Sequence, residues 1–201
     1  KDDDVLSVAK QWVKVEYEKP GAVYLGLVHR LDRPASGLMV LARTSKAAAR
    51  LSEQFKNRTV QKTYFALVDG HPVEGDVYED WLKKWDENVR VVEPKRPGGK
   101  LAKLVIQEVF WFGTAALVRI ELSTGRAHQI SVQLASRGFP IIGDFRYGSR
   151  TRLDGKNLAL HAGRLAFEHP TKKERMVFTS ELPRAWPPEI REKASQMLRK
   201  I

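Results

Sequence analysis

Two neighbouring strand-forming segments constrain the fold of this chain most strongly. Residues 103–112 and 115–122 are both predicted to be strands, and Gly113-Thr114 joins them as the turn of a hairpin. A further strand is expected at residues 60–68, where Lys62 and Tyr64 share one face because side chains alternate along a strand. A hairpin of this kind requires an antiparallel sheet.

Helices are expected between the strands. Thr44 or Ser45 is predicted to cap a helix with Ala48, Leu51 and Phe55 on its inner stripe. An earlier helix is expected over residues 7–19, with Ser7 as N-cap and with Val8, Trp12 and Val15 on one face. The remaining expected elements are a short buried strand over 37–42, a mobile surface loop over 76–99 and a helix over 128–136. Because strands and helices are mixed without β–α–β regularity, we predict an α+β fold with a mixed, largely antiparallel β-sheet flanked by helices.

Composition excludes several classes of protein. The chain has 201 residues, enough to bury a core without disulfides or a structural metal. It contains no cysteine, which excludes a disulfide scaffold, cysteine-ligated zinc, an iron–sulfur cluster and a cysteine nucleophile. No apolar run approaches the roughly 20 residues of a membrane span, and the start, Lys1–Asp4, lacks the features of a signal peptide. We expect one cytoplasmic domain over residues 1–201, with a natural N-terminus further upstream.

The charge indicates a polyanionic partner. The net charge is +11, and it is concentrated in residues 29–64, with 8 basic and 2 acidic groups, and residues 145–201, with 13 and 6. Such an excess favours nucleic acid or an anionic membrane surface, although lysines and arginines also serve as ordinary solvated surface charges. The first block is the more informative, because it surrounds the residues most suited to chemistry.

Asp32 is the first candidate for chemistry. It stands between Arg30 and Arg33, in a segment that Pro34 and Gly37 keep out of regular structure. Flanking cations favour the carboxylate, which can then act as a nucleophile or a base. Taken alone, the segment also allows a structural role, in which Asp32 caps a turn or pairs with Arg33.

The motif around Asp32 and five later elements resemble the RluA family of pseudouridine synthases. The segment His29-Arg30-Leu31-Asp32-Arg33-Pro34-Ala35-Ser36-Gly37-Leu38 is similar to that family's HRLD-x-x-(T/S)-G-L signature. The later elements follow in family order: Lys62-Thr63-Tyr64, Thr124-Gly125-Arg126-Ala127-His128-Gln129-Ile130, Gly138–Asp144 with Tyr147-Gly148, Leu160-His161-Ala162, and His169-Pro170. Together they cover most of the chain, so the resemblance implies a pseudouridine synthase catalytic domain.

The resemblance also implies residue roles. Asp32 would be the catalytic aspartate, Tyr64 the active-site tyrosine and Arg126 the arginine that pairs with the aspartate. The family isomerises uridine in RNA without a cofactor or metal, and Arg30 would occupy the place that the flipped base leaves in the stack. The chemistry leaves two routes open, because a carboxylate can attack C1′ of the ribose or add to C6 of the base. Tyr64 can remove the proton from C5, or stack on the uracil and relay to another group.

RNA, as tRNA or rRNA, is the expected partner. We expect no membrane partner, and we expect the protein to be a monomer. The expected RNA contacts are Arg30, Arg33, Arg43, Lys46, Arg50 and Lys62. Other conspicuous residues are expected to be structural: His29 and His128 as hydrogen-bonded histidines, and Asp144 as a loop anchor. Trp81, Trp85 and Trp111 fit base stacking or ordinary hairpin and core positions.

The sequence departs from the family pattern at two places. Ser131 stands where the family often has an arginine, and the KP-x-G element that usually precedes the aspartate motif is not recognisable. No S4-like RNA-binding domain is visible either. Two other functions were weighed. A non-catalytic RNA-binding module would be expected to have lost Asp32 or Tyr64, and a glycoside-processing enzyme normally uses two carboxylates, whereas the motif has one.

Overall fold

The computed structural model describes residues 4–153 and 158–201, so the first three residues of the acidic start lie outside the described part. The described chain forms two compact units. The first unit comprises the described residues of 1–30, 39–60 and 167–176, and the second those of 31–38, 61–166 and 177–201. The predicted single domain over 1–201 stays a prediction. Within 4–153 and 158–201, no helix is long and apolar enough to cross a membrane.

The first unit contains two helices and a two-stranded sheet. Helix α1 spans Val5–Glu16, and helix α2 spans Ser45–Lys56. Strands β1 (Gly26–Leu27) and β3 (Leu41–Ala42) pair in antiparallel orientation. The Thr44 side chain accepts a hydrogen bond from the Ala47 N–H, and Leu51 is buried, so the predicted cap and stripe of α2 are confirmed.

The prediction for α1 was wrong at its cap and its buried face. The helix begins earlier than expected because the Asp4 carboxylate, and not Ser7, accepts the free N–H groups of the first turn. Its buried residue is Val13, whereas the expected inner residues are exposed: Val8 by 54%, Trp12 by 57% and Val15 by 68%. Amphipathic spacing identified the helix but not the side that packs.

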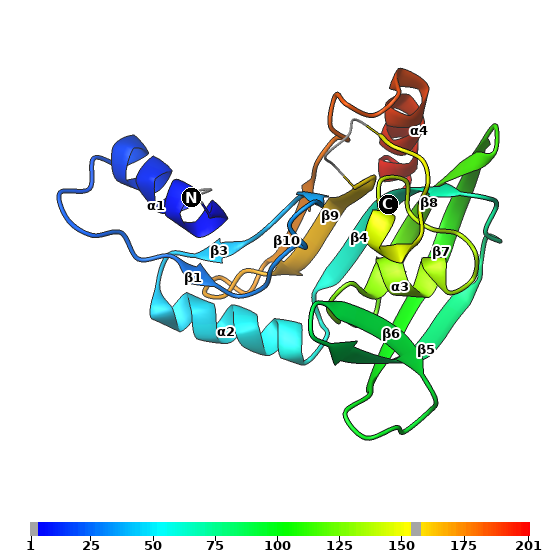
Figure 1. The fold of residues 1–201 in the computed structure, drawn as a ribbon. Coiled ribbons are helices and arrows are strands. Elements are labelled where there is room, and N and C mark those ends of the chain that lie inside the picture. Colours follow the sequence, from blue (N-terminus) through cyan, green and yellow to red (C-terminus); the bar gives the residue numbers. More distant parts are fainter. Residues whose placement is uncertain (1–3, 154–157) are drawn as a thin grey trace. The chain divides into compact units, whose positions relative to one another are not determined.

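The second unit is built on an eight-stranded sheet (Figure 1). Its main path has the order β10-β9-β4-β8-β7-β5-β6, and β2 joins β9 outside that path. The strands are β2 (Ser36–Gly37), β4 (Gln61–Asp69), β5 (Val77–Trp85), β6 (Asn88–Val92), β7 (Lys100–Phe112), β8 (Ala115–Leu122), β9 (Leu160–Glu168) and β10 (Arg175–Thr179). The pairs along β9-β4-β8-β7-β5-β6 are antiparallel, whereas β2 pairs with β9 in parallel. The predicted α+β class and the 103–122 hairpin are confirmed.

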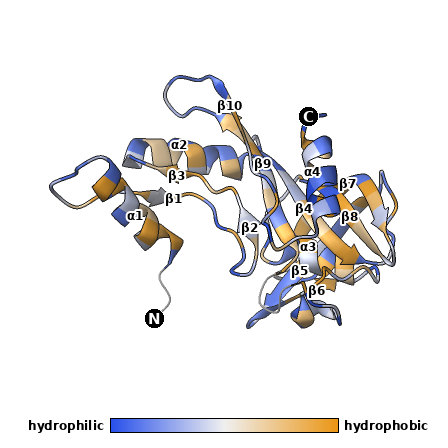
Figure 2. Ribbon diagram, turned by 90° about the horizontal axis from the view of Figure 1, so that it is seen from above, coloured by the Kyte–Doolittle hydropathy of each residue, from blue (hydrophilic) through white to orange (hydrophobic). Residues whose placement is uncertain are grey.

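Two helices cover opposite faces of this sheet. Helix α3 (Gln129–Ala135) places Val132 against Leu82, Val89 and Ala102. Helix α4 (Pro188–Leu198) reaches the other face, where the Lys193 Nζ lies 5.1 Å from the centre of the Phe110 ring. Apolar residues are prominent on β7 and β8 (Figure 2), and Leu104, Ile106 and Ile120 are fully buried. A short 3-10 helix, η1 (Phe145–Tyr147), follows α3.

Two further local predictions were wrong. The segment 76–99 is not a mobile loop but a hairpin of β5 and β6, stabilised by burial of Tyr78, Leu82 and Val89. The expected strand at 37–42 is divided between β2 and β3, which pair with different partners. Gly37 separates the two because its φ of +115° is a conformation that side-chain-bearing residues rarely adopt. Strands β9 and β10 and helix α4 were not among the elements expected from the sequence.

Candidate active site

The segment that carries Asp32 is attached to β9. In β2, Ser36 and Gly37 pair with His161 and Ala162. The Leu38 N–H donates to the Ala162 carbonyl oxygen at 2.9 Å, which extends the attachment by one residue. A Cβ on Gly37 would collide with the backbone of Ala162, so a glycine is required for this close approach. The aspartate is therefore held by a strand that lies more than a hundred residues further along the chain.

A partly buried hydrogen-bonded pair strengthens this attachment. The Ser36 Oγ lies 2.8 Å from the His161 Nδ1, and the His161 Nε2 lies 3.3 Å from the Ser180 carbonyl oxygen. Since a carbonyl only accepts, Nε2 carries the proton and Nδ1 accepts from the serine hydroxyl. Burial lowers the pKa of His161, so the ring stays neutral in this arrangement.

Tyr64 lies on the other side of β9. Its Cα pairs with Ala162, the residue that also pairs with Gly37. Because neighbouring strands are about 4.8 Å apart, the two backbones that flank Ala162 are separated by about 10 Å. Burial raises the pKa of Tyr64 to about 12, and the negative charge of Asp32 acts in the same direction. The structure thus brings Asp32 and Tyr64 within electrostatic range of each other.

Arg126 lies in a turn that two buried polar side chains hold. The Thr124 Oγ1 donates to the Gln129 Oε1 at 2.7 Å and accepts from the Lys103 N–H at 2.8 Å. The Gln129 Oε1 also accepts from the Arg126 N–H at 3.0 Å, and its Nε2 donates to the Lys103 carbonyl oxygen at 3.1 Å. Both side chains are almost completely buried. This network fixes the backbone from which the arginine projects.

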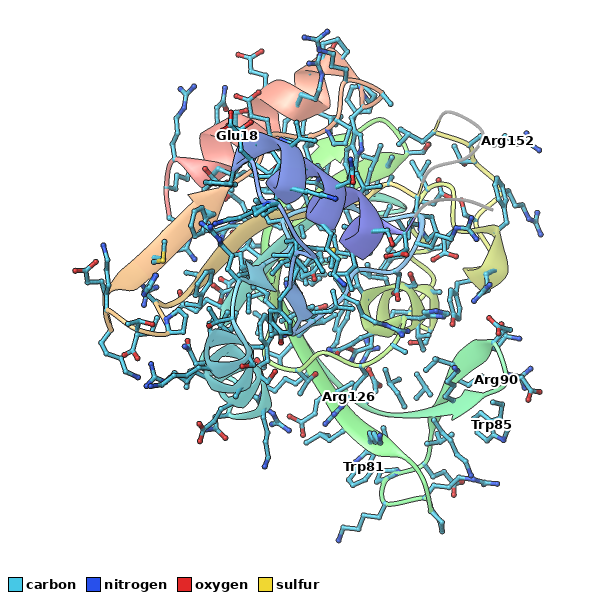
Figure 3. All side chains as sticks on the ribbon, turned by 90° about the vertical axis from the view of Figure 1, so that its left-hand side faces the viewer. Glu18, Trp81, Trp85, Arg90, Arg126 and Arg152 are labelled. Atoms are coloured by element: carbon cyan, nitrogen blue, oxygen red, sulfur yellow. The ribbon has the colours of Figure 1, made fainter. Side chains whose placement is uncertain are left out.

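The side chain of Arg126 is directed along the end of the sheet. Its Nε donates to the Leu101 carbonyl oxygen at 2.9 Å, and Figure 3 labels it near Trp81. The Lys62 Nζ, on the strand that bears Tyr64, donates to the Thr124 carbonyl oxygen at 3.1 Å. Lys62 therefore braces the arginine turn, in addition to any contact with RNA. The expected pairing of Arg126 with Asp32 stays a prediction.

A second phenol, which the sequence analysis did not single out, lies in range of Asp32. The Tyr147 Oη is 2.7 Å from the His128 Nδ1 and accepts from the Val89 N–H at 3.1 Å. Burial raises the pKa of Tyr147, and the charges of Asp144 and Asp32 add to this effect. The only sequence signal for this residue was its place in the Tyr147-Gly148 element. Tyr147 joins α3 to the β5–β6 hairpin at the edge of the site.

The residues expected to be structural have hydrogen bonds of the kind that this role requires. The His29 Nε2 accepts from the Val40 N–H at 2.9 Å and its ring stacks on Phe55, while His128 bonds to Tyr147. Asp144 is buried and accepts hydrogen bonds from Ser131 and from the Tyr147 N–H. Its burial raises its pKa, and these hydrogen bonds oppose the increase. Ser131, the departure from the family pattern, thus anchors the Asp144 loop.

The expected RNA contacts have different local environments. Arg33 in the second unit and Arg30, Arg43 and Lys46 in the first are exposed. The Arg43 guanidinium lies 4.5 Å from the centre of the Tyr17 ring, and the Arg50 Nη1 donates to the Pro170 carbonyl oxygen at 2.7 Å. Arg50 therefore has a structural bond of its own, and the RNA contacts stay predictions. Among residues 4–153 and 158–201, no three histidine or acidic side chains are grouped to hold a metal ion.

The fold and these residues define a class of protein: an α+β domain in which an aspartate on an irregular segment lies within electrostatic range of a half-buried tyrosine on the sheet. A family model described as "RNA pseudouridylate synthase" matches residues 1–136, a range that contains Asp32, Tyr64 and Arg126. This chain belongs to that family, and the predicted relationship is confirmed.

Individual relatives agree with this assignment. The chain is 37% identical over 163 residues to the "Uncharacterized RNA pseudouridine synthase YlyB" of Bacillus subtilis, covering 81% of this chain and 54% of the relative. It is 39% identical over 168 residues to the "Ribosomal large subunit pseudouridine synthase C" of Vibrio cholerae, covering 79% and 52%. The chain thus spans about half the length of the curated relatives it matches.

Solved structures share the fold. The human RNA pseudouridylate synthase domain containing 4 superposes with a TM-score of 0.75 at 25% identity, covering 90% of this chain and 79% of that one. The human RNA pseudouridylate synthase domain containing 1 gives a TM-score of 0.68 at 25% identity, with 98% and 86% covered. The pseudouridine synthase fold expected from the sequence is confirmed.

Proposed function

We propose that this chain is the catalytic part of an RNA pseudouridine synthase, which isomerises uridine to pseudouridine within an RNA chain. Family membership supports this proposal, as does the electrostatic coupling of Asp32 to Tyr64. The names of several relatives refer to the ribosomal large subunit, which favours ribosomal RNA over tRNA as the substrate. We place the enzyme in the cytoplasm and expect it to act as a monomer.

The reaction needs no external group donor. The N1–C1′ bond of uridine breaks, the uracil turns, a C5–C1′ bond forms, and the proton on C5 is replaced by one on N1. Asp32 forms the transient covalent bond, either to C1′ of the ribose or to C6 of the uracil. Either route holds one fragment covalently while the base turns. In the C1′ route C5 displaces the carboxylate as the new bond forms, and in the C6 route the carboxylate is eliminated after the base has rejoined the ribose, so the enzyme returns unchanged.

Tyr64 is suited to act after Asp32 has reacted. With a pKa of about 12, its phenol is protonated in the resting enzyme and donates a hydrogen bond or stacks on the uracil. Part of this high pKa comes from the charge of Asp32. When Asp32 forms its covalent bond, the negative charge passes to the uracil, as an N1 anion in the C1′ route or an enolate in the C6 route. The protonated phenol can donate a hydrogen bond to the charged base, and after the C5–C1′ bond has formed Tyr64 takes part in moving the C5 proton, directly or by relay to another group.

RNA binding completes the proposal. The target uridine cannot react inside a base stack, so it is flipped into the site at a cost of a few kcal/mol. Arg126 contributes a fixed positive charge that orients the Asp32 carboxylate. Arg30 fills the place of the flipped base, and the basic residues of 29–64 contact phosphates.

The observation that carries the proposal is the electrostatic coupling of Asp32 to Tyr64, and Asp32→Asn tests it. Asparagine cannot act as the nucleophile, so we expect product formation to fall by at least about a thousandfold, as for other covalent catalysts that lose their nucleophile. The affinity for RNA should stay nearly constant. The measurement is pseudouridine formed in a transcript of ribosomal RNA from the same organism, followed by mass spectrometry.

A matched control distinguishes the loss of the Asp32 carboxylate from the loss of any negative charge in this basic block. Glu53→Gln removes an exposed carboxylate from the same basic block, and this variant should remain fully active. Full activity of Asp32→Asn would refute the role of Asp32. A wild-type chain that binds RNA but forms no pseudouridine in it would favour the non-catalytic RNA-binding module.

A further inference from the structure

The β5–β6 hairpin presents one apolar and one polar face. Leu82 and Val89 point toward α3 and are buried with Val132. Because side chains alternate, the opposite face of the hairpin carries Trp81, Lys83 and Trp85 from β5, and Asn88, Arg90 and Val92 from β6. We call this face the hairpin platform. Figure 3 shows Trp81, Trp85 and Arg90 in the same region of the second unit.

Aromatic rings and cations are interleaved on the hairpin platform. Trp85 is 39% exposed, and the Lys83 Nζ lies 5.1 Å from the centre of its ring. Lys83 pairs directly across the strands with Arg90, which is exposed. A sheet face on which tryptophans alternate with lysine and arginine is suited to bases that stack and phosphates that pair with cations.

The local charge supports an anionic partner. Residues 81–100 contain six basic and three acidic groups, although residues 65–144 as a whole carry a slight negative charge. The acidic groups Asp86 and Glu87 lie in the turn between the strands, and Glu93 follows β6. On the same sheet face, Glu79 is already paired with Lys103 at 3.3 Å. Over residues 81–100 the cations therefore outnumber the acidic groups by three.

The hairpin platform begins next to the candidate active site. The Arg126 Nε donates to the Leu101 carbonyl oxygen, and Leu101 pairs with Trp81. Because neighbouring strands are about 4.8 Å apart, the backbone of Trp81 lies about that distance from Leu101, which holds Arg126. An RNA strand that runs from Arg126 along β5 would therefore meet Trp81 first and then Trp85.

We propose that the hairpin platform binds single-stranded RNA next to the target uridine, with bases stacked on Trp81 and Trp85 and phosphates on Lys83 and Arg90. This inference rests on the proposed function, because it concerns the RNA that the same site modifies. The platform extends the RNA contacts beyond the motif residues. It also gives the tryptophans of the hairpin a role that packing alone does not require.

Binding of a fluorescein-labelled single-stranded oligouridine, followed by fluorescence anisotropy, tests the proposal. Trp85→Ala should weaken binding about tenfold, the effect of losing one stacked base, and Trp85→Phe should retain most of the affinity. The double substitution Lys83→Gln and Arg90→Gln should reduce the slope of log affinity against log salt by about 1.4, the value for two phosphate contacts on a single strand.

Two controls match these variants. Trp111→Ala removes a tryptophan that is 67% exposed on the far end of β7, and Lys84→Gln removes the adjacent lysine on the opposite hairpin face. Both should bind like the wild type. Equal losses in the controls and the platform variants, or no loss in Trp85→Ala, would overturn the proposal.

The test separates this inference from the proposed function. If Trp85→Ala binds and modifies RNA normally while Asp32→Asn is inactive, the platform is wrong and the enzyme assignment stands. If the wild type binds oligouridine through the platform without modifying any RNA, the assignment fails and the platform stands. If the platform variants keep their affinity for RNA but no longer bind a protein that the wild type binds, the face binds protein instead.

Discussion

His161 shows how one buried side chain can govern the geometry of the catalytic segment. The ring accepts from Ser36, four residues after Asp32, and donates to the Ser180 carbonyl oxygen. The neutral ring with its proton on Nε2 makes both bonds at once, whereas a second proton on Nδ1 would reverse the bond to Ser36, whose oxygen would then accept. The burial that lowers the pKa of His161 therefore also maintains this arrangement.

At the residue scale, we predict that acid weakens the fold through His161. Its pKa is below the ordinary 6.5 in the folded chain, so below pH 6.5 the unfolded chain binds a proton that the folded chain does not. The stability contributed by the neutral ring is present above 6.5 and is lost as the pH falls toward the lowered value. Urea unfolding at several pH values should show this loss as a smaller free energy of unfolding in acid. In His161→Gln, the free energy of unfolding should change less between pH 6.5 and 5. If the free energy of unfolding of the variant changed with pH as steeply as that of the wild type, the prediction would be contradicted.

Among the elements, the turn between β8 and α3 is held by buried polar groups instead of apolar packing. Thr124 and Gln129 share hydrogen bonds with each other and with both backbone groups of Lys103. Such a network is rigid when every member is satisfied, and costly when one is removed. Its rigidity is transmitted to Arg126, whose N–H bonds to Gln129.

At the element scale, we predict that Thr124→Val disturbs catalysis more than RNA binding. Valine has the same shape but leaves the Lys103 N–H without its buried acceptor, which costs about 1–3 kcal/mol of folding free energy. The looser turn should lower kcat about tenfold or more, with little change in KM, because small displacements of positioning groups slow the reaction strongly. Ser136→Ala, at the C-terminal end of α3, is the control. Equal kcat values for the two variants would argue against this role of the turn.

Across the whole molecule, positive charge is distributed over both units. The block 29–64 contributes Arg43, Lys46 and Arg50 to the first unit and Arg33 and Lys62 to the second. Lys62 and Arg50 also have structural bonds to carbonyl oxygens, so the number of charges available to phosphates is smaller than the formal charge suggests. Binding energy should therefore come from a limited set of phosphate contacts.

For the whole molecule, we predict RNA binding that weakens with salt. If four phosphates are engaged, the slope of log affinity against log salt is about −2.8, so a fourfold rise in salt weakens binding about 50-fold. Anisotropy titrations at a series of potassium chloride concentrations measure this slope. Affinity that does not change with salt would contradict an electrostatic RNA interface.

Local pattern determined the parts of this protein whose structure depends on neighbours in sequence. The 103–122 hairpin, helix α2 with its Thr44 cap, the strand that bears Tyr64 and the short helix after Arg126 were all predictable, because turns, caps and periodicity act over a few residues. The order of the motifs was also sufficient to indicate the family. These features do not depend on which distant segments meet.

Only the tertiary structure decided what the distant segments do to each other. Ser36 and His161 are 125 residues apart, and their pairing follows from the register of β2 on β9. The segment 76–99, which was expected to be a loop, forms a hairpin that packs against α3. The face of α1 that was expected to be buried is exposed. The physical reason is that burial and strand register are set by the whole set of packed elements, which short-range sequence patterns do not specify.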